Sequence, residues 1–367
     1  MGITEIVRHV PRIYARYRQL VQSIRREPPD VAVLIDFPDV NFRLARHLRR
    51  LGIPVVWFAS PQLWAWKRGR LRWVRQRVTR MLVLFPFEER FYRARGIAAE
   101  FVGHPLAALQ RVGSTRLSYA AAHMGANPAA STHLERTWIA LLPGSRWKEV
   151  RANLPTMLEA AAALGPGYDF LIPVASTLSR EAFAELLSET VPVLQWPDGS
   201  SVTLVPDAAE ALQHARASVV ASGTATVLAA VVGNPFLIVY RVSALTFALA
   251  KCLVRYPAEI AAERDEDGTL PVGMVNLIAG RRVVPELLNQ RFTGEAVAET
   301  LRPLLEDGPE RAAQIEGLRA VRESLHRGPA KGGDVVQAFG TERVAQVVVE
   351  VLNERAAANV RSAGRRV

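Results

Sequence analysis

The stretch Leu-Leu-Pro-Gly-Ser-Arg at residues 141–146 is matched about eighty residues later by Ala-Ser-Gly-Thr-Ala-Thr at residues 221–226. Each stretch follows an apolar run typical of a buried strand and precedes a segment typical of a helix. A strand that leads through a tight glycine turn into a helix directs unpaired backbone N–H groups and a partial positive charge at one point, and this geometry binds phosphate. Two such turns at the same end of one parallel sheet indicate a site for a nucleotide diphosphate, with Arg146 as its counter-charge.

The alternation of strands and helices continues through the chain and predicts an α/β protein with two doubly wound, Rossmann-like domains. A chain of 367 residues is long enough for two domains with sizeable cores. The expected division is a first domain at 1–125, a second domain at 136–335, a C-terminal helix at 336–355 and a small, basic, disordered tail at 356–367.

The individual elements follow from the apolar runs and the helical periodicity. Strands are expected at 31–36, 55–59, 81–85, 100–102, 138–142, 170–174, 203–205, 218–221 and 236–240. Helices are expected at 3–25, 40–51, 88–95, 148–164, 178–189, 207–215, 224–232, 244–254, 281–290, 295–306, 309–325 and 341–355.

The composition is that of a globular protein, with 49% hydrophobic and 22% charged residues. The single cysteine, Cys252, excludes an intrachain disulfide and a cysteine metal cluster and is consistent with a reducing compartment. Residues 217–240 carry no charge and are numerous enough to span a bilayer. Because Gly233, Asn234 and Pro235 interrupt this stretch, we expect a strand, a helix and a strand of a buried parallel sheet instead.

The net charge of +11 is concentrated in one part of the chain. Between Val40 and Phe87 there is no acidic residue, whereas eleven are basic. A charge this concentrated indicates an anionic partner near one face, the alternative being a solvated basic helix. Nucleic acid could use such a face, but no nucleic-acid-binding motif accompanies it.

Seven segments carry a further signal, and they are 35–42, 60–66, 84–88, 103–105, 142–146, 221–226 and 275–281. Taken together and in this order, they resemble the lipid-A-disaccharide synthase family. The Ser-Pro-x-x-Trp-Ala-Trp segment at 60–66 is specific, whereas any one glycine turn alone would be a weak signal. The resemblance runs from about residue 1 to residue 350.

The resemblance implies an inverting glycosyltransferase of the two-Rossmann GT-B architecture, with the acceptor side first and the nucleotide side second. Its reaction would transfer 2,3-diacylglucosamine from a UDP donor to 2,3-diacylglucosamine 1-phosphate and form the β(1→6) disaccharide of lipid A. The resemblance implies no cofactor and no catalytic metal. It also implies a cytoplasmic enzyme peripheral on the anionic inner membrane, and it is compatible with a homodimer.

Two aspartates are candidates for the base that takes the proton from the attacking hydroxyl. Asp36 lies at the C-terminal end of an apolar strand, where chemistry is usually located in such sheets, and it matches the first Asp of the family's motif. Asp39 is the second candidate, and its alternative role is to cap the following helix.

The remaining candidates bind substrate or membrane. The donor candidates are Gly144, Ser145, Arg146, Ser222, Gly223, Thr224 and, by resemblance only, Asn276. Ser60 and Gln62 follow a strand end and are expected to line the sugar cleft. His104 is open to an acid–base role or a structural one. The candidates for contact with the headgroup region or the acyl chains are Trp64, Trp66, Arg68, Arg72 and Trp73.

The chain departs from the family's pattern in two places. The family's opening strand and Gly-Glu-x-Ser-Gly-Asp turn have no counterpart here, so we expect an incomplete first domain with exposed apolar surface. Leu228 stands where the family usually has a Glu suited to hydrogen-bonding a ribose, and leucine accepts no hydrogen bond. Two alternatives therefore stay open: another sugar-nucleotide enzyme of the same fold, such as a peptidoglycan-type glycosyltransferase or an epimerase, and a non-catalytic membrane-binding relative.

Overall fold

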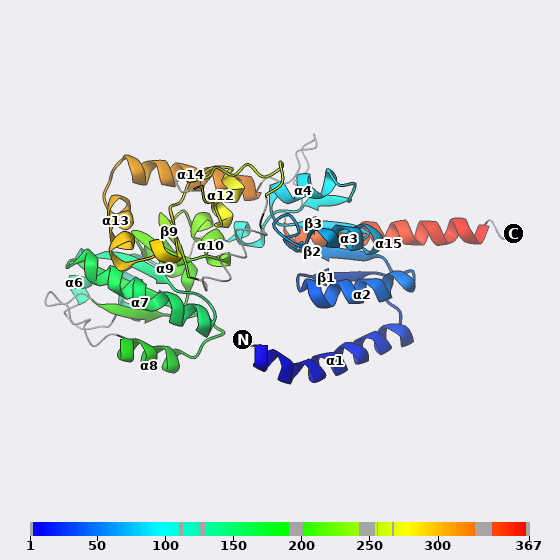
Figure 1. Ribbon diagram of the computed structural model, residues 1–367, viewed down its shortest axis with the longest axis horizontal. Coiled ribbons are helices and arrows are strands. Elements are labelled where there is room, and N and C mark those ends of the chain that lie inside the picture. The colour runs from blue at the N-terminus through cyan, green and yellow to red at the C-terminus, as the bar shows by residue number, and fades with distance from the viewer. Residues whose placement is uncertain are drawn as a thin grey trace. The chain divides into compact units, whose positions relative to one another are not determined.

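The computed structural model describes residues 3–109, 113–124, 130–190, 201–241, 254, 256–265, 268–326 and 340–364. The chain forms two compact units (Figure 1). The first unit consists of residues 1–108, 253–260 and 325–367, and the second consists of residues 109–252 and 261–324. Residues 109–125, which we expected in the first domain, therefore group with the second unit.

The first unit is built on a four-stranded parallel sheet in the order β1-β2-β3-β4. Its strands are β1 (Ala32–Ile35), β2 (Val55–Phe58), β3 (Arg80–Val83) and β4 (Ala99–Phe101). Its first helices are α1 (Ile3–Arg26), α2 (Pro38–Arg50), α3 (Leu71–Arg77) and α4 (Pro86–Arg93), with short 3-10 turns at η1 (Arg68–Arg70) and η2 (Pro105–Ala108). All four strands predicted for this region are confirmed.

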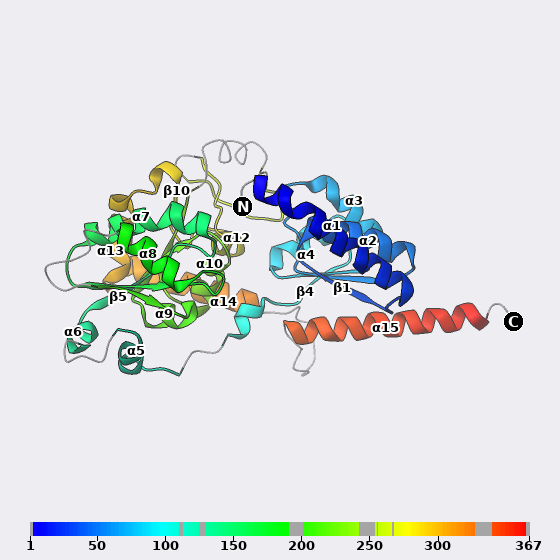
Figure 2. The same cartoon turned by 90° about the horizontal axis from the view of Figure 1, so that it is seen from below.

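The last helix, α15 (Thr341–Gly364), belongs to the sheet of the first unit (Figure 2). Val347 and Val351 pack with Val56 of β2 and its neighbours on one face of the sheet. On the other face, the rings of Phe42 and Trp57 lie 4.7 Å apart. The helix continues to Gly364, so the expectation of a helix ending at residue 355 and a disordered tail was wrong for residues 356–364; residues 365–367 lie outside the described part.

The second unit contains a six-stranded parallel sheet in the order β10-β9-β8-β5-β6-β7. Its strands are β5 (Thr137–Leu142), β6 (Tyr168–Pro173), β7 (Val202–Val205), β8 (Ala217–Ala221), β9 (Phe236–Tyr240) and β10 (Glu286–Leu288). Numbered from β5, this is the 3-2-1-4-5-6 order of the Rossmann fold, whose strand order reverses between β5 and β8. Ligands bind at this switch point in open α/β sheets, and both glycine turns of the sequence analysis follow these two strands.

Helices cover both faces of this second sheet. They are α5 (Arg116–His123), α6 (Ala130–Glu135), α7 (Trp147–Leu164), α8 (Arg180–Thr190), α9 (Ala208–His214), α10 (Thr224–Val232), α12 (Met274–Ala279), α13 (Gly294–Leu305) and α14 (Pro309–His326). A core on one face joins Ile139 and Leu141 of β5 to Leu154 of α7 and Leu301 of α13. The two units together confirm the predicted α/β fold class with two parallel sheets.

One predicted helix was wrong and one lies outside the described residues. Residues 281–290 hold β10 and the 3-10 turn η3 (Asn289–Arg291) in place of a helix, because Pro285 and the β-branched Val283 and Val284 favour an extended chain. The helix expected at 244–254 falls on residues of which only residue 254 is described.

The long uncharged stretch at 217–240 forms β8, α10 and β9, as the sequence predicted. Within the described ranges, we find no helix with both the length and the apolar character needed to cross a bilayer.

Candidate active site

The chain turns sharply where β1 ends. Asp36 and Phe37 both have left-handed backbone angles, with φ of 44° and 43°. The Asn41 amide holds this turn by donating to the carbonyl oxygens of Ile35 and Asp36, at 3.1 and 2.8 Å. Each left-handed non-glycine residue costs on the order of 1 kcal/mol, and such strain clusters at functional sites. The Asp36 side chain is exposed and accepts no hydrogen bond from the described residues, so it is open to a substrate hydroxyl.

Asp39 lies in the first turn of α2 and is ion-paired. Its Oδ1 is 2.6 Å from Nη2 of Arg70. The N-cap of α2 is Phe37, which makes no side-chain cap, so the alternative of Asp39 as the cap does not apply. Accepting a substrate proton at Asp39 would disrupt this ion pair, and the geometry therefore favours Asp36 as the base.

A buried carboxylate organises the ends of β2 and β3. Glu88 is 2% exposed, and its Oε1 accepts from Ser60 Oγ at 2.9 Å and Trp64 Nε1 at 3.2 Å. Its Oε2 accepts from the backbone N–H groups of Leu84 and Phe85, at 3.3 and 3.2 Å. Burial raises the pKa of Glu88 to about 7, although these four hydrogen bonds oppose the shift. No role was predicted for Glu88 from the sequence; the available signal was its place in the Leu-Phe-Pro-Phe-Glu segment, at the third residue of a helix.

We expect ionisation of Glu88 to make stability depend on pH. Its pKa in the folded state is about 7, against 4.5 when unperturbed, so its contribution to stability is fully present below pH 4.5 and is lost as pH rises toward 7 and beyond. The loss should approach about 3 kcal/mol relative to Glu88→Gln, which cannot ionise. Denaturant melts of both proteins between pH 4.5 and 8.5 measure this difference, and parallel curves would contradict it.

His104 has the surroundings of a structural histidine. It is 6% exposed, and its Nδ1 accepts from the backbone N–H of Leu106 at 3.1 Å. Its ring stacks on Phe85 with a centroid distance of 5.5 Å. Burial lowers the pKa of His104 to about 4, so the imidazole is neutral at pH 7. Of the two roles left open, the structure favours the structural one.

Trp64 does not lie at the surface. It is 3% exposed, packs edge-on against Phe87 at 5.2 Å, and also contacts the ring of Tyr256. The expectation that Trp64 contacts the membrane was therefore wrong. Its indole N–H donates to Glu88 and its ring packs in the core. Trp66 is 49% exposed, with Nζ of Lys67 4.1 Å from its ring centroid, and so stays a candidate for membrane contact.

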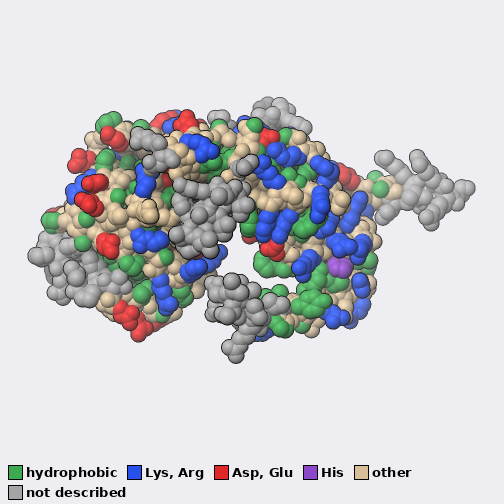
Figure 3. Space-filling model, in the orientation of Figure 1, with side chains coloured by type: hydrophobic (Ala, Val, Ile, Leu, Met, Phe, Trp, Pro, Cys, Tyr) green, Lys and Arg blue, Asp and Glu red, His purple; other side chains and the backbone are tan. Residues whose placement is uncertain are grey.

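The other surface candidates differ in their exposure. Gln62 and Arg72 are exposed, whereas Trp73 is half-buried. Arg68 donates to the carbonyl oxygen of Trp64 at 3.3 Å, which fixes the turn before α3. Lys and Arg side chains gather on the visible face of the first unit (Figure 3). We define the basic surface as the exposed cations of the acid-free segment from Val40 to Phe87, which are Arg43, Arg46, Arg49, Arg50, Lys67, Arg72 and Arg75.

In the second unit, the two glycine turns lie side by side, because β5 and β8 are neighbours with Leu142 opposite Val220. Gly144 has φ of 132°, and a Cβ there would meet Cβ of Glu149 at 2.6 Å, so this turn requires glycine. Oε2 of Glu149 accepts from Ser145 N–H at 3.1 Å, and its Oε1 is 2.8 Å from Nη1 of Arg146. The carboxylate of Glu149 thus occupies the groups that we expected to hold a phosphate, a contact that was not predicted from the sequence.

The second turn is more open. Gly223, with φ of 153°, is the N-cap of α10 and makes no side-chain cap. Gly223 and Thr224 are exposed, and the first N–H groups of this helix are suited to an anion. Leu228 lies further along α10 and is half-buried.

Asn276 is committed to the fold. It is fully buried, and its Nδ2 donates to the carbonyl of Val284 at 2.8 Å and to Oε1 of Glu286 at 2.7 Å. Its Oδ1 accepts from the N–H groups of Val283 and Val284, at 2.8 and 2.9 Å. Both ends of the amide are used inside the unit, so the expected direct contact with the donor is corrected to a role in holding the chain before β10.

Comparison with known proteins decides the family. The family described as lipid-A-disaccharide synthetase matches residues 1–334. The chain belongs to this family. A lipid-A-disaccharide synthase of Acidobacterium capsulatum is 45% identical over 366 residues, which cover 97% of this chain and 84% of that protein. As a member of the lipid-A-disaccharide synthase family, the chain is a glycosyltransferase of lipid A disaccharide formation.

Solved structures that resemble the chain agree on its fold. The glycotransferase of kitacinnamycin has a TM-score of 0.57 and 14% identity, covering 96% of this chain and 83% of that one. A UDP-GlcNAc 2-epimerase from Neisseria meningitidis bound to UDP-GlcNAc has a TM-score of 0.53 and 12% identity, covering 92% and 80%. At these identities the likeness concerns the fold, which is of the GT-B type.

Proposed function

We propose that this synthase-family chain transfers 2,3-diacylglucosamine from its UDP donor to 2,3-diacylglucosamine 1-phosphate, giving the β(1→6) disaccharide and UDP. Family membership over residues 1–334 supports the overall reaction. The observation that carries the donor side is the pair of glycine turns at the switch point between β5 and β8.

The donor's diphosphate fits the second unit. The N–H groups at the start of α10 and around Ser145 supply donors, and Arg146 supplies positive charge once it leaves Glu149. These groups matter most as the sugar C1–O bond to the diphosphate breaks, because UDP then carries extra negative charge. The structure of the epimerase with UDP-GlcNAc shows that a fold of this type can hold a UDP-sugar.

The acceptor's hydroxyl fits the first unit. The Asp36 carboxylate takes the proton of the acceptor's 6-hydroxyl while the oxygen of that hydroxyl forms the new bond to C1 of the donor sugar. Attack from the face opposite the departing UDP gives the inverted, β-linked product. Glu88 is a positioning residue in this proposal, because it accepts hydrogen bonds from Ser60 and from the backbone N–H groups of residues 84 and 85.

Product analysis tests this function. The chain is incubated with the UDP-diacylglucosamine donor and the diacylglucosamine 1-phosphate acceptor, and mass spectrometry follows the phosphorylated disaccharide and UDP. We expect both products in equal amounts, and neither when the acceptor is omitted or a GDP donor is used. A change in the donor sugar without disaccharide would instead favour the epimerase alternative, and vesicle binding without UDP binding would favour the non-catalytic one.

Removing the charge of Glu149 should tighten UDP binding. Glu149→Gln keeps the size of the side chain and removes its negative charge. The glutamine does not repel the diphosphate and does not form the ion pair with Arg146. We expect the Kd for UDP to fall up to about tenfold, corresponding to roughly 1.4 kcal/mol. Calorimetric titration measures it, with Glu159→Gln on the same helix as the matched control. Weaker UDP binding in Glu149→Gln alone would show that Glu149 supports the turn and does not compete with the ligand.

We also propose that the basic surface of the first unit associates with an anionic membrane, with Trp66 at the boundary. Tryptophan prefers the headgroup region, and each basic residue near an anionic surface contributes about 1 kcal/mol. Acylated substrates require such a location, because their chains remain in the bilayer. Vesicle sedimentation with and without phosphatidylglycerol, repeated on Trp66→Ser, measures this association.

A further inference from the structure

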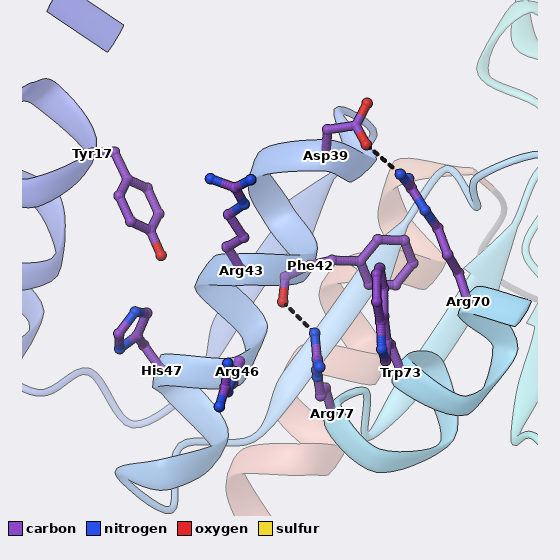
Figure 4. Close-up of a pocket in the computed structure, with 9 residues that line it drawn as sticks. All are labelled: Tyr17, Asp39, Phe42, Arg43, Arg46, His47, Arg70, Trp73 and Arg77. Atoms are coloured by element: carbon purple, nitrogen blue, oxygen red, sulfur yellow. Dashed lines mark hydrogen bonds and ion pairs between the residues drawn. The ribbon is translucent and has the colours of Figure 1, made fainter. Parts of the chain in front are cut away.

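A cavity of about 540 Å³ lies within the first unit (Figure 4). Three segments form its wall. Helix α1 contributes Tyr17, α2 contributes residues from Asp39 to His47, and the η1–α3 segment contributes Arg70, Trp73 and Arg77. Its volume is within the range of small-molecule sites, so it can hold more than one phosphate or water molecule.

The cavity carries an excess of positive charge. Its lining includes Arg43, Arg46, Arg70 and Arg77 and one carboxylate, Asp39, which is already paired with Arg70 at 2.6 Å. Among the described residues, neither Arg43 nor Arg46 has an ion-pair partner. Burial, together with the charges of Arg46 and Arg72, lowers the pKa of Arg77. Arg43 and Arg46 are exposed, and the guanidinium groups that line the cavity carry like charges, so an anion bound between them would offset their mutual repulsion.

The same cavity has an aromatic wall. The rings of Phe42 and Trp73 meet at 5.5 Å and 66°. The guanidinium carbons of Arg70 and Arg77 lie 5.6 and 5.0 Å from the Trp73 centroid. Arg77 is fixed there because it donates to the carbonyl oxygen of Phe42 at 2.9 Å. A flat apolar surface beside converging cations suits a ring that bears a phosphate, and not a phosphate alone.

We propose that this cavity binds a glycosyl phosphate, with the phosphate monoester held by Arg43, Arg46 and Arg77 and the sugar ring against Trp73. The proposal rests on the proposed function, whose acceptor carries such a group. Helix α2 rises about 10 Å between Asp39 and Arg46. A ligand lying along α2 with its phosphate at Arg46 therefore extends toward the end of β1, where Asp36 lies. In this arrangement, specificity for the acceptor is determined by Arg43, Arg46 and Arg77.

The test compares two pairs of arginines on one helix. R43Q/R46Q removes two lining charges, and R49Q/R50Q removes two exposed charges of α2 that do not line the cavity. The probe is glucosamine 1-phosphate, titrated by calorimetry into each protein, and glucosamine and inorganic phosphate are titrated as separate arms. We expect R43Q/R46Q to weaken glucosamine 1-phosphate binding about 10- to 100-fold and R49Q/R50Q to change it less than about twofold. Binding of glucosamine 1-phosphate should exceed that of either fragment.

Binding to vesicles that contain phosphatidylglycerol tests whether the cavity recognises lipid headgroups in place of a glycosyl phosphate. Equal losses of vesicle binding in both pairs, with no difference between them toward glucosamine 1-phosphate, would overturn the proposal and assign the cavity to general membrane charge. UDP titration reports separately on the second unit. If wild type binds glucosamine 1-phosphate through Arg43 and Arg46 but fails to bind UDP, the cavity stands and the proposed transfer reaction fails.

Discussion

We expect Asp36→Asn to lower kcat by about 10²- to 10⁴-fold, because an amide cannot take the proton of the attacking hydroxyl. The structure adds a reason to expect a clean effect. The turn at Asp36 is held by the side chain of Asn41 and by the backbone, and the Asp36 carboxylate receives no hydrogen bond from the described residues. The substitution should therefore leave the fold and the UDP affinity unchanged. Single-turnover rates with saturating donor and acceptor give the chemical step directly.

Asp39→Asn provides the competing measurement. It breaks the ion pair with Arg70 and alters the cavity beside α2, so we expect a higher KM for the acceptor and a smaller change in kcat. A loss in kcat below about fivefold in Asp36→Asn would remove its assignment as the base. A large loss of kcat in Asp39→Asn, with Asp36→Asn nearly active, would transfer the role to Asp39.

The repeating parts of the fold could be predicted from the sequence, because they depend on local patterns. The runs before Gly144 and Gly223 are apolar throughout, as buried parallel strands are, and the glycines mark where the backbone must turn. The order of the strands was less accessible, since it depends on which strands pair. The return of α15 to the first sheet could not be predicted, because the apolar stripe with Val347 and Val351 does not specify which sheet it covers.

The roles of the site residues that were missed or misplaced depend on hydrogen-bond and packing partners that the sequence pattern does not identify, and some of these partners lie far along the chain. Trp64 lies among cations in the sequence and was expected at the surface, but Phe87 and Tyr256 bury it. Glu88 reads as an ordinary helix residue until Ser60 and Trp64 are seen to donate to it. Asn276 was assigned to the donor by resemblance, and only its four hydrogen bonds show that its amide is already used.

Arg146→Ala should reduce kcat/KM for the donor by about 10- to 100-fold. The physical reason is a charge-assisted contact with the diphosphate, which contributes on the order of 1.5–3 kcal/mol. The side chain is 77% exposed and has only Glu149 as an ion-pair partner among the described residues, so its removal should cost the fold little. Steady-state kinetics with varied donor measure the effect. Arg151→Ala in α7 is the matched control. Equal losses of kcat/KM in both variants would show that Arg146 contributes only as part of the general surface charge.

Combining Arg146→Ala with Glu149→Gln separates two ways in which Glu149 can oppose the diphosphate. If Glu149 acts only by holding Arg146, its substitution should have no effect on UDP affinity once Arg146 is gone. If it also competes for the Ser145 N–H, to which it is bonded at 3.1 Å, part of the gain should remain in the double variant. The second result is the one we expect, because both carboxylate oxygens are engaged at the turn. The carboxylate would then act as an internal substitute for phosphate, which the donor must displace from both groups to bind.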